Sequence, residues 1–299
     1  MLLLTQAPDP PPEDNDDIVA STRAAIAAGF VPVRLPPEAD HRGDLLAPLR
    51  ALATRARPEL AVWVGTIPAE STYRAVHAAL RERGVVMVND PEQHLELMEF
   101  DRAYARLAGL TPTSVVVTRP EQAEDAAALV GLPAFVKGAV LSRKHLGWSH
   151  CVAATVPELR ERIAALLRSP FHARGRVIVR TLAPLRHYTV AATDIPIGRE
   201  YRVFLHRGEP LAHGYYWPYF HDQMSLGPGE EEAVLTRARE AAARLSAPLV
   251  SLDVGQLEDG RWIVIEAGDP QFAGLSFIAP GPLWRRLAAR LAAEERALA

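Results

Sequence analysis

The chain has 299 residues, enough for about two domains of ordinary size. Its hydrophobic content of 48% and charged content of 23% are typical of a globular protein, and no apolar run approaches the roughly 18–20 residues of a membrane span. The 33 basic and 36 acidic residues give a net charge of −3 and are spread along the chain, so nucleic acid is not an expected partner. The single cysteine, Cys151, excludes an intramolecular disulfide and fits a cytoplasmic location.

Residues 1–91 alternate short apolar runs with helical patterns. This alternation predicts parallel strands joined by helices, as in a Rossmann-like βαβ domain. No G-x-G-x-x-G follows the first strand, so a dinucleotide site is not expected there. The predicted strands are Leu2–Thr5, Phe30–Arg34, Leu60–Val64 and Val85–Val88, and the predicted helices are Asp17–Ala28, Leu45–Arg57 and Glu70–Arg83.

The pattern changes after Asn89-Asp90-Pro91, where Glu92–Ala108 is typical of one long helix. Residues 118–182 then form a small α+β unit within 92–299, and antiparallel strands follow it. The whole chain is therefore predicted to be α/β followed by α+β. The later strands are expected at Ser114–Thr118, Ala134–Lys137, Val177–Arg180, Glu200–His206, Leu211–Tyr216, Leu249–Leu257 and Trp262–Glu266, and the helices at Glu121–Val130, Pro157–Leu167, Glu230–Leu245 and Leu283–Leu298.

Carboxylates mark the last two predicted strands. Asp253 and Glu266 lie on strands joined by a tight turn, and Asp269 lies just beyond the second strand. A carboxylate at the end of an apolar strand needs a partner, and Mg²⁺ takes carboxylates together with phosphate oxygens. The pattern predicts Asp253 and Glu266 as metal ligands, with Asp269 or a water completing the shell; the alternative is a solvated strand end, which we accept for Asp259. Because Glu266 would repel Asp253, Asp253→Asn is expected to leave the ligand-free stability unchanged or slightly higher.

Three basic residues suit phosphate binding. Lys137 ends an apolar strand and offers a point charge, and Lys144 lies in the loop that follows. Arg202 lies on a predicted strand, where a guanidinium can bind phosphate in bidentate fashion. The alternatives are solvent-exposed lysines and, for Arg202, a cross-strand ion pair with Glu200 or Glu209.

The aromatic segment Tyr215–Phe220 follows a predicted hairpin strand. It either walls a substrate pocket or packs against the last helix.

The segment SLDVGQLEDGRWIVIEAGDPQFAGLS resembles the metal-binding hairpin of ATP-grasp enzymes, and its EAGDPQ resembles the form usual in the clade named for one arginine and two lysines. Val136-Lys137-Gly138 and the strand of Arg202 follow the order of that family. The chain departs from the family pattern at Gly268, where an Asn often follows the Glu, at Pro270, and at Arg180, where most members have Glu. Arg180 and Arg202 both remain candidates for the clade arginine. The resemblance covers about Asn89 to Phe277 and, more weakly, the N-terminal unit.

The resemblance implies an ATP-grasp fold with a pre-ATP-grasp domain (1–91), an ATP-grasp domain (92–299) and a lid (118–182). It implies a carboxylate–amine or carboxylate–thiol ligase that forms an acyl phosphate and releases ADP and phosphate, acting on small-molecule or peptide substrates; a homodimer is one assembly to consider. An ATP-grasp kinase and a non-catalytic nucleotide-binding module are the alternatives. The implied roles are catalysis by Arg202 and Lys144, ATP binding by Lys137, Lys144, Arg180, Thr181, Leu182 and Arg202, and Mg²⁺ binding by Asp253, Glu266 and Asp269.

Overall fold

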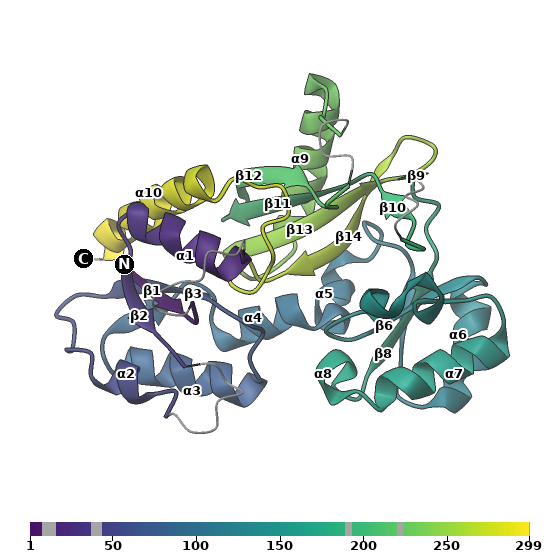
Figure 1. Cartoon of the computed structure of the whole chain (residues 1–299), viewed down its shortest axis with the longest axis horizontal. Helices are drawn as coiled ribbons and strands as arrows, with labels where there is room; N and C mark the ends of the chain where they lie inside the picture. Colours follow the sequence, from purple (N-terminus) through teal and green to yellow (C-terminus); the bar gives the residue numbers. More distant parts are fainter. Residues whose placement is uncertain (8–15, 37–43, 189–192, 220–223, 299) are drawn as a thin grey trace.

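The computed structural model describes residues 1–7, 16–36, 44–188, 193–219 and 224–298. It has three parts, each built on its own sheet, and the helices α4 and α5 run between them (Figure 1). The predicted combination of α/β and α+β structure is confirmed.

The N-terminal sheet is parallel, in the order β2-β1-β3-β4, as the sequence predicts. Its strands are β1 (Leu2–Thr5), β2 (Val31–Arg34), β3 (Glu59–Val64) and β4 (Val85–Met87), and its helices are α1 (Asp17–Ala27), α2 (Ala47–Arg50) and α3 (Glu70–Arg81). The predicted helix at Leu45–Arg57 is mostly wrong. Arg55 donates its backbone N–H to the carbonyl of Arg83, which turns the chain towards β3.

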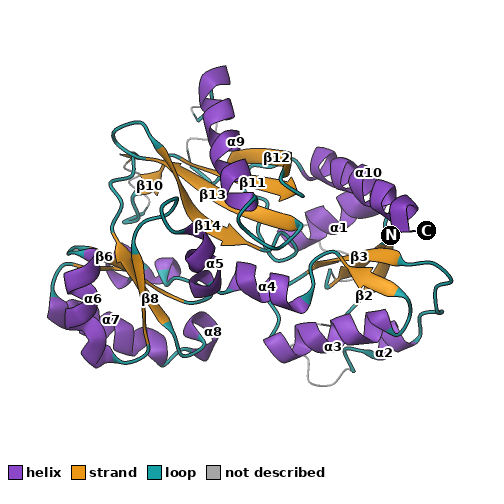
Figure 2. Cartoon of the chain, turned by 180° about the vertical axis from the view of Figure 1, so that it is seen from behind, coloured by secondary structure: helices purple, strands orange, loops and turns teal. Residues whose placement is uncertain are grey.

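The central sheet is antiparallel, in the order β12-β11-β13-β14. Helix α9 (Pro228–Ala242) packs on one face, and the other face shares a core with α1 and with α10 (Pro280–Leu298) (Figure 2). Because α10 also covers the N-terminal sheet, one apolar core joins these two parts. The strands are β11 (Glu200–His206), β12 (Glu209–Tyr215), β13 (Leu249–Gln256) and β14 (Trp262–Gly268).

The small sheet is antiparallel, in the order β5-β8-β6-β7, and α6 (Ala123–Val130) and α7 (Val156–Leu167) pack on it. The short helix α8 (Pro170–Ala173) follows α7. After the sheet, two strands of two residues each, β9 (His187–Tyr188) and β10 (Ile197–Gly198), pair with each other in antiparallel fashion. The strands are β5 (Ser114–Val117), β6 (Ala134–Gly138), β7 (Val152–Ala153) and β8 (Val177–Thr181).

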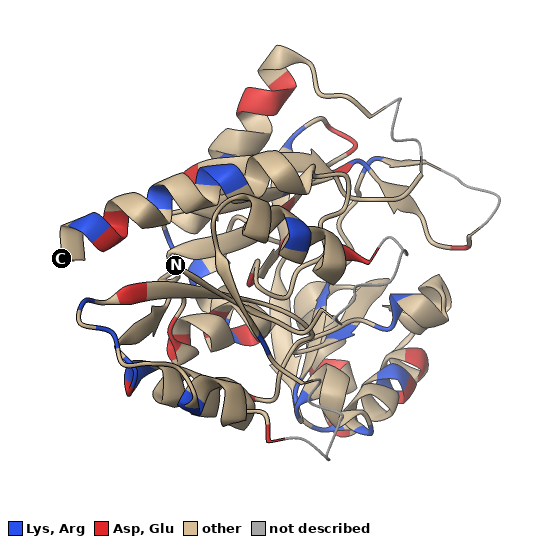
Figure 3. Ribbon diagram, turned by 60° about the vertical axis from the view of Figure 1, so that its left-hand side comes forward, with Lys and Arg blue, Asp and Glu red and all other residues tan. Residues whose placement is uncertain are grey.

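Basic and acidic residues are interspersed on the outside, for example along α10 (Figure 3). Within the described ranges, no helix is long and apolar enough to cross a membrane.

The single long helix predicted at Glu92–Ala108 is wrong, because the chain breaks at Glu99. Helix α4 (Pro91–Met98) ends there and α5 (Phe100–Leu107) begins, with Glu99 in extended geometry at φ −112° and ψ 102°. The backbone N–H of Phe100 donates to the carbonyl of Ala139 instead of continuing the helix, at 2.8 Å. This bond ties the break to the small sheet.

The buried carboxylate of Glu99 binds three arginines at this break. Arg102 and Arg176 each lie 2.6 Å from Oε2, and Arg174 lies 3.1 Å from Oε1. Burial alone would raise the pKa of Glu99, but the hydrogen bonds from Arg102 and Arg174 hold the pKa below its usual value. Since Arg174 and Arg176 lie beside the small sheet, these ion pairs hold that part against the α4–α5 junction.

Glu99→Gln should lower the free energy of unfolding by about 1.5–3 kcal/mol at pH 7, because hydrogen bonds to a charged group are weakened. The folded pKa lies below the ordinary value of 4.5, so the stabilisation is complete above pH 4.5 and is lost as the pH falls through the folded pKa. Urea unfolding should therefore show that the free energies of unfolding of the variant and the parent protein become more similar as the pH is lowered. Glu92→Gln, at an exposed ion pair, is the control and should cost less than about 1 kcal/mol. A difference that stays constant with pH would contradict this account.

Candidate functional site

Three charged residues lie side by side on the central sheet. Arg202 on β11 is paired in register with Asp253 on β13, which is paired with Glu266 on β14. Residues in register on adjacent strands point to the same face of a sheet, so the three side chains converge. A register shift after Asp253 leaves Ile265 as an extra residue of β14 and sets Glu266 opposite Asp253.

Arg202 and Asp253 form a bidentate ion pair. The guanidinium Nε and Nη2 each lie 2.8 Å from a carboxylate oxygen, and Nη1 donates to the carbonyl of Gly274 at 2.7 Å. The guanidinium also lies over the ring of Tyr216, 4.8 Å from its centroid. Burial alone would lower the pKa of Arg202, but the Asp253 carboxylate raises it well above its usual value. The arginine therefore stays charged and its fork is fixed in one direction.

Lys137 brings a cation from the small sheet to Glu266. Lys137 lies on β6 and is buried, and its Nζ forms an ion pair with Oε1 of Glu266. Burial would raise the pKa of Glu266, but Lys137, followed by Lys144 and Arg180, holds it below its usual value. The carboxylate is therefore ionised at neutral pH, as a metal ligand must be.

A narrow pocket lies beside this ion pair, between the small and central sheets. Arg180 on β8 lines it and donates to the carbonyl of Ile265 at 3.0 Å and to Oγ1 of Thr111 at 2.6 Å. Burial lowers the pKa of Arg180 to about 10. The next two residues of the chain, Thr181 and Leu182, continue the lining, and the Thr181 hydroxyl donates to a backbone carbonyl at 2.9 Å.

Lys144 lies at the other wall of the narrow pocket, where Nζ is 5.0 Å from the ring centroid of Trp217 and 5.9 Å from that of Phe135. Glu200, buried in the same pocket, accepts a hydrogen bond from the Trp217 indole at 3.1 Å, and burial raises its pKa. Sequence reasoning missed Glu200 as a pocket residue and treated it only as a partner for Arg202. The sequence does hold a signal for this position. Residues two apart on a strand lie on the same face of the sheet, so Glu200 lies on the same face as Arg202.

A larger cavity of about 700 Å³ adjoins the ion pairs and contains the Arg202, Asp253 and Glu266 side chains in its lining. Tyr216 and Trp217 form part of its wall, as the sequence allowed for the aromatic segment; Phe220 of that segment lies outside the described residues. The residues that follow β14 form the opposite part of the wall, from Phe272 to Phe277.

Asp269 also borders the large cavity, but its carboxylate is buried and engaged elsewhere. Asn89, His94 and Gln271 contact its two oxygens at 2.9–3.1 Å. Its expected place as a third metal ligand is therefore not favoured by this geometry.

The side chains available as metal ligands fit Mg²⁺ better than a metal ion that is coordinated by protein groups alone. Among the described residues, no three His, Cys, Asp or Glu side chains are placed to hold a metal together. Mg²⁺ is commonly held by one or two carboxylates together with substrate phosphates, and Asp253 and Glu266 supply two carboxylates beside cations suited to phosphate.

A family model for the ATP-grasp domain, family 3 of the clade named for one arginine and two lysines, matches residues 128–287. No curated protein sequence matches the chain.

The solved structures with a similar fold include the following three. They are an ATP-grasp RimK domain protein from Sphaerobacter thermophilus (TM-score 0.59, 16% identity, covering 97% of this chain and 99% of that chain), D-alanyl-alanine synthetase A from Vibrio cholerae (TM-score 0.64, 14% identity, 99% and 98%) and the ATP-grasp ligase PsnB complexed with minimal precursor, Mg and ADP (TM-score 0.56, 16% identity, 99% and 98%). At these identities the likeness shows the fold alone.

Asp253→Asn should lower the melting temperature of the ligand-free protein, which reverses the expectation from sequence. The reason is the bidentate bond to Arg202, because weakening a hydrogen-bonded charge pair costs about 1.5–3 kcal/mol. Asp259→Asn is the matched control in an exposed turn and should change stability by less than about 0.5 kcal/mol. Equal melting temperatures for Asp253→Asn and the parent protein would contradict this prediction and support the expectation from sequence that the substitution leaves stability unchanged.

Proposed function

The chain belongs to family 3 of the ATP-grasp clade named for one arginine and two lysines, and on that basis we propose that it is an ATP-dependent ligase that activates a carboxylate as an acyl phosphate and releases ADP and phosphate. The observation that carries the proposal is the row Arg202–Asp253–Glu266 on adjacent strands, with Lys137 reaching it from the small sheet. This arrangement brings two carboxylates and two cations together, as phosphoryl transfer requires.

The narrow pocket is the proposed adenine site. It is lined mainly by apolar side chains, and we assign the backbone of Thr181 and Leu182, which also line it, to the adenine edge. Arg180, fixed by two hydrogen bonds, forms one wall of the site. Lys144 lines this pocket and Lys137 pairs with Glu266, and we assign both lysines to the ATP phosphates.

Asp253 and Glu266 are the proposed holders of Mg²⁺, which when bound supplies charge neutralisation for the phosphates. Each carboxylate is paired with a cation of the chain, Glu266 with Lys137 and Asp253 with Arg202, and these cations would be available to phosphate oxygens if the carboxylates held Mg²⁺. We assign Arg202 to the transferring γ-phosphoryl group, because its side chain lines the large cavity together with Asp253 and Glu266. With Lys144, it is the proposed catalytic pair.

The large cavity is the proposed site of the carboxylate and of the amine or thiol that attacks the acyl phosphate. Its volume of about 700 Å³ accommodates a small molecule or the end of a peptide. Two similar structures support this range of substrates: one is named as a synthetase of D-alanyl-alanine, and the other is a ligase complexed with a precursor, Mg and ADP.

The proposal includes a pre-ATP-grasp domain over residues 1–91 and an ATP-grasp domain over 92–299, with 118–182 as a lid. The lid carries Lys137, Lys144 and Arg180, so its position determines whether these cations meet the carboxylates of the central sheet. A cytoplasmic location is part of the proposal, and the buried free thiol of Cys151 is compatible with it.

Incubation with ATP, Mg²⁺ and a panel of carboxylates and amines should release ADP and phosphate in equal amounts. The rate of release should be high only when the correct carboxylate and amine are both present. Product analysis by ion-exchange chromatography checks this. Stoichiometric AMP and pyrophosphate would exclude the acyl-phosphate route. A stable phosphorylated product formed without an amine would identify a kinase instead.

Asp253→Asn and Lys137→Ala should each lower ADP formation by at least about 10²-fold, since loss of charge stabilisation in phosphoryl transfer is worth several kcal/mol. The two variants should differ in binding. Asp253→Asn should raise the Mg²⁺ concentration for half-saturation of a non-hydrolysable ATP analogue about tenfold or more. Lys137→Ala should weaken analogue binding at saturating Mg²⁺, with little change in the Mg²⁺ requirement.

Asp259→Asn is the matched control for both measurements and should resemble the parent protein, because Asp259 lies in an exposed turn paired with Arg261. Normal turnover of Asp253→Asn at saturating Mg²⁺ would remove the metal assignment.

A further inference from the structure

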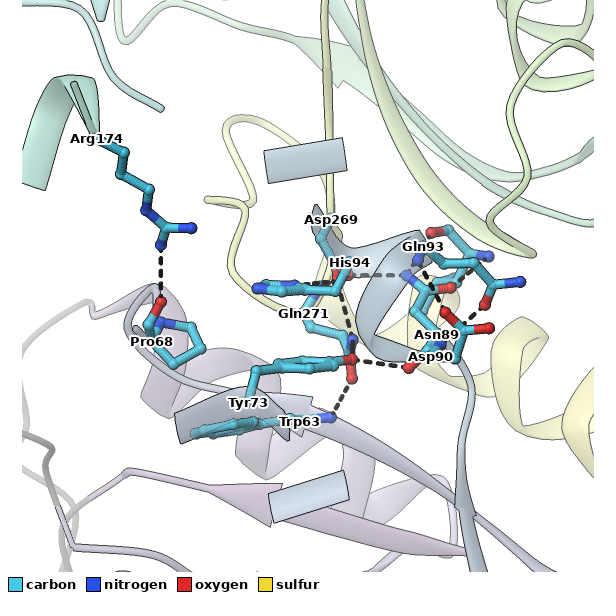
Figure 4. Close-up of polar contacts among 11 residues, drawn as sticks. Trp63, Pro68, Tyr73, Asn89, Asp90, Gln93, His94, Arg174, Asp269 and Gln271 are labelled. Carbon is cyan, nitrogen blue, oxygen red and sulfur yellow. Dashed lines mark hydrogen bonds and ion pairs between the residues drawn. The ribbon is translucent and has the colours of Figure 1, made fainter. Parts of the chain in front are cut away.

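Asp269 is the centre of a buried hydrogen-bond network below the large cavity (Figure 4). Oδ1 accepts from Nδ2 of Asn89 and from the backbone N–H of Gln271, both at 3.1 Å. Oδ2 lies 2.9 Å from Nδ1 of His94 and accepts from Nε2 of Gln271 at 3.1 Å. Four polar contacts therefore engage the two carboxylate oxygens of Asp269.

Gln271 extends this network into the N-terminal sheet. Its Oε1 accepts from the backbone N–H of Trp63 at 2.8 Å, and its Nε2 also donates to the hydroxyl of Tyr73 at 2.9 Å. Its backbone carbonyl accepts from Gly65 at 3.3 Å, and the Tyr73 hydroxyl donates to the carbonyl of Asn89 at 2.8 Å. The end of β3 is thus bonded to the segment that follows β14.

The segment 269–277, which begins at this network, continues into the proposed active site. The carbonyl of Gly274 accepts from Nη1 of Arg202 at 2.7 Å, and the backbone N–H of Leu275 donates to Asp17 at 2.9 Å. Residues Phe272 to Gly274, Ser276 and Phe277 line the large cavity. The position of segment 269–277 therefore determines both the wall of the cavity and one of the hydrogen bonds that aim Arg202.

We propose that Asp269 is a positioning residue that fixes segment 269–277 and, through the Gly274 carbonyl, Arg202 and the substrate wall, and that it does not bind the metal. This inference rests on the proposed function for the role of Arg202. It also gives the N-terminal sheet a part in the reaction, because Trp63, Gly65 and Tyr73 hold one end of the same segment.

Two variants test the network at different points. Asp269→Asn keeps the volume but turns one accepting oxygen into a donating amide, which faces donors of His94 or Gln271. Tyr73→Phe is milder: it removes a hydroxyl that neither Asp269 nor the large cavity contacts, and so keeps the test available if Asp269→Asn folds poorly. Asp259→Asn is the matched control for the change of Asp to Asn.

Hydrogen exchange followed by mass spectrometry should show exchange at least about tenfold faster in peptides covering 63–66 and 271–277 for Asp269→Asn, and a smaller increase in the same peptides for Tyr73→Phe. The Mg²⁺ half-saturation for a non-hydrolysable ATP analogue should stay within about threefold of the parent in both. With a competent substrate pair, kcat should fall about 10–100-fold with little change in KM for ATP. Effects of this size are typical of residues that orient a ligand-binding side chain without touching the ligand themselves.

A rise of tenfold or more in the Mg²⁺ half-saturation of Asp269→Asn would overturn the inference and make Asp269 a ligand. Unchanged exchange at 271–277 in both variants would overturn it as well. If Asp253→Asn leaves the Mg²⁺ requirement unchanged, the proposed function fails, while the exchange measurement still decides whether Asp269 holds the segment.

Discussion

The ion pair between Lys137 and Glu266 is the contact on which the site depends, because it joins the small sheet to the central sheet. The narrow pocket is formed between the same two sheets, and neither sheet alone supplies all of its walls. Phe100, at the start of α5, supports this junction from below: its ring lies 5.2 Å from Nζ of Lys137 and 4.9 Å from the guanidinium of Arg180. A cation from one sheet and a carboxylate from the other therefore define both the position and the spacing of the two parts.

The charges of the site are balanced within the chain. Arg202 neutralises Asp253 and Lys137 neutralises Glu266, so neither carboxylate is left as an uncompensated charge between the sheets. A ligand that binds here must bring both signs at once, because an anion alone would separate the cations from their carboxylates. A metal–nucleotide complex has that property. The same balance explains how a concentrated group of charged residues is compatible with a folded state in the absence of ligand.

The parts of the site that could be predicted from sequence are those that local patterns encode. The turn at 258–260 and the carboxylates on either side of it identify a hairpin, and register then brings Asp253 opposite Glu266. The parallel N-terminal sheet was predictable in the same way, from the alternation of strand and helix patterns. Lys137 was recognisable because it ends an apolar strand, although nothing nearby in the sequence indicates that it pairs with Glu266.

The features that escaped prediction depend on contacts between distant segments. The break at Glu99 arises because Phe100 bonds to Ala139 and the carboxylate binds arginines far along the chain, whereas the local pattern of residues 92–108 is helical throughout. From its place after Glu266, Asp269 or a water was predicted to complete the metal shell, and the sequence did not indicate the contacts that engage the Asp269 carboxylate. Its hydrogen bonds to Asn89 and His94 depend on how the N-terminal part packs against the hairpin, which no short segment encodes.

The packing of α10 on α1 has a consequence for synthesis on the ribosome. Ala25 and Phe30 share a core with Trp284, Leu287 and Leu291, although most of the chain lies between them. Residues around Phe30 are synthesised long before Trp284, so on the ribosome they remain partly uncovered until translation has passed the central sheet. The ring of Phe30, which packs edge-on against Trp284, is among the apolar groups left uncovered. Between the synthesis of α1 and that of α10 the nascent chain therefore carries exposed apolar surface, and chaperones have access to it during this period.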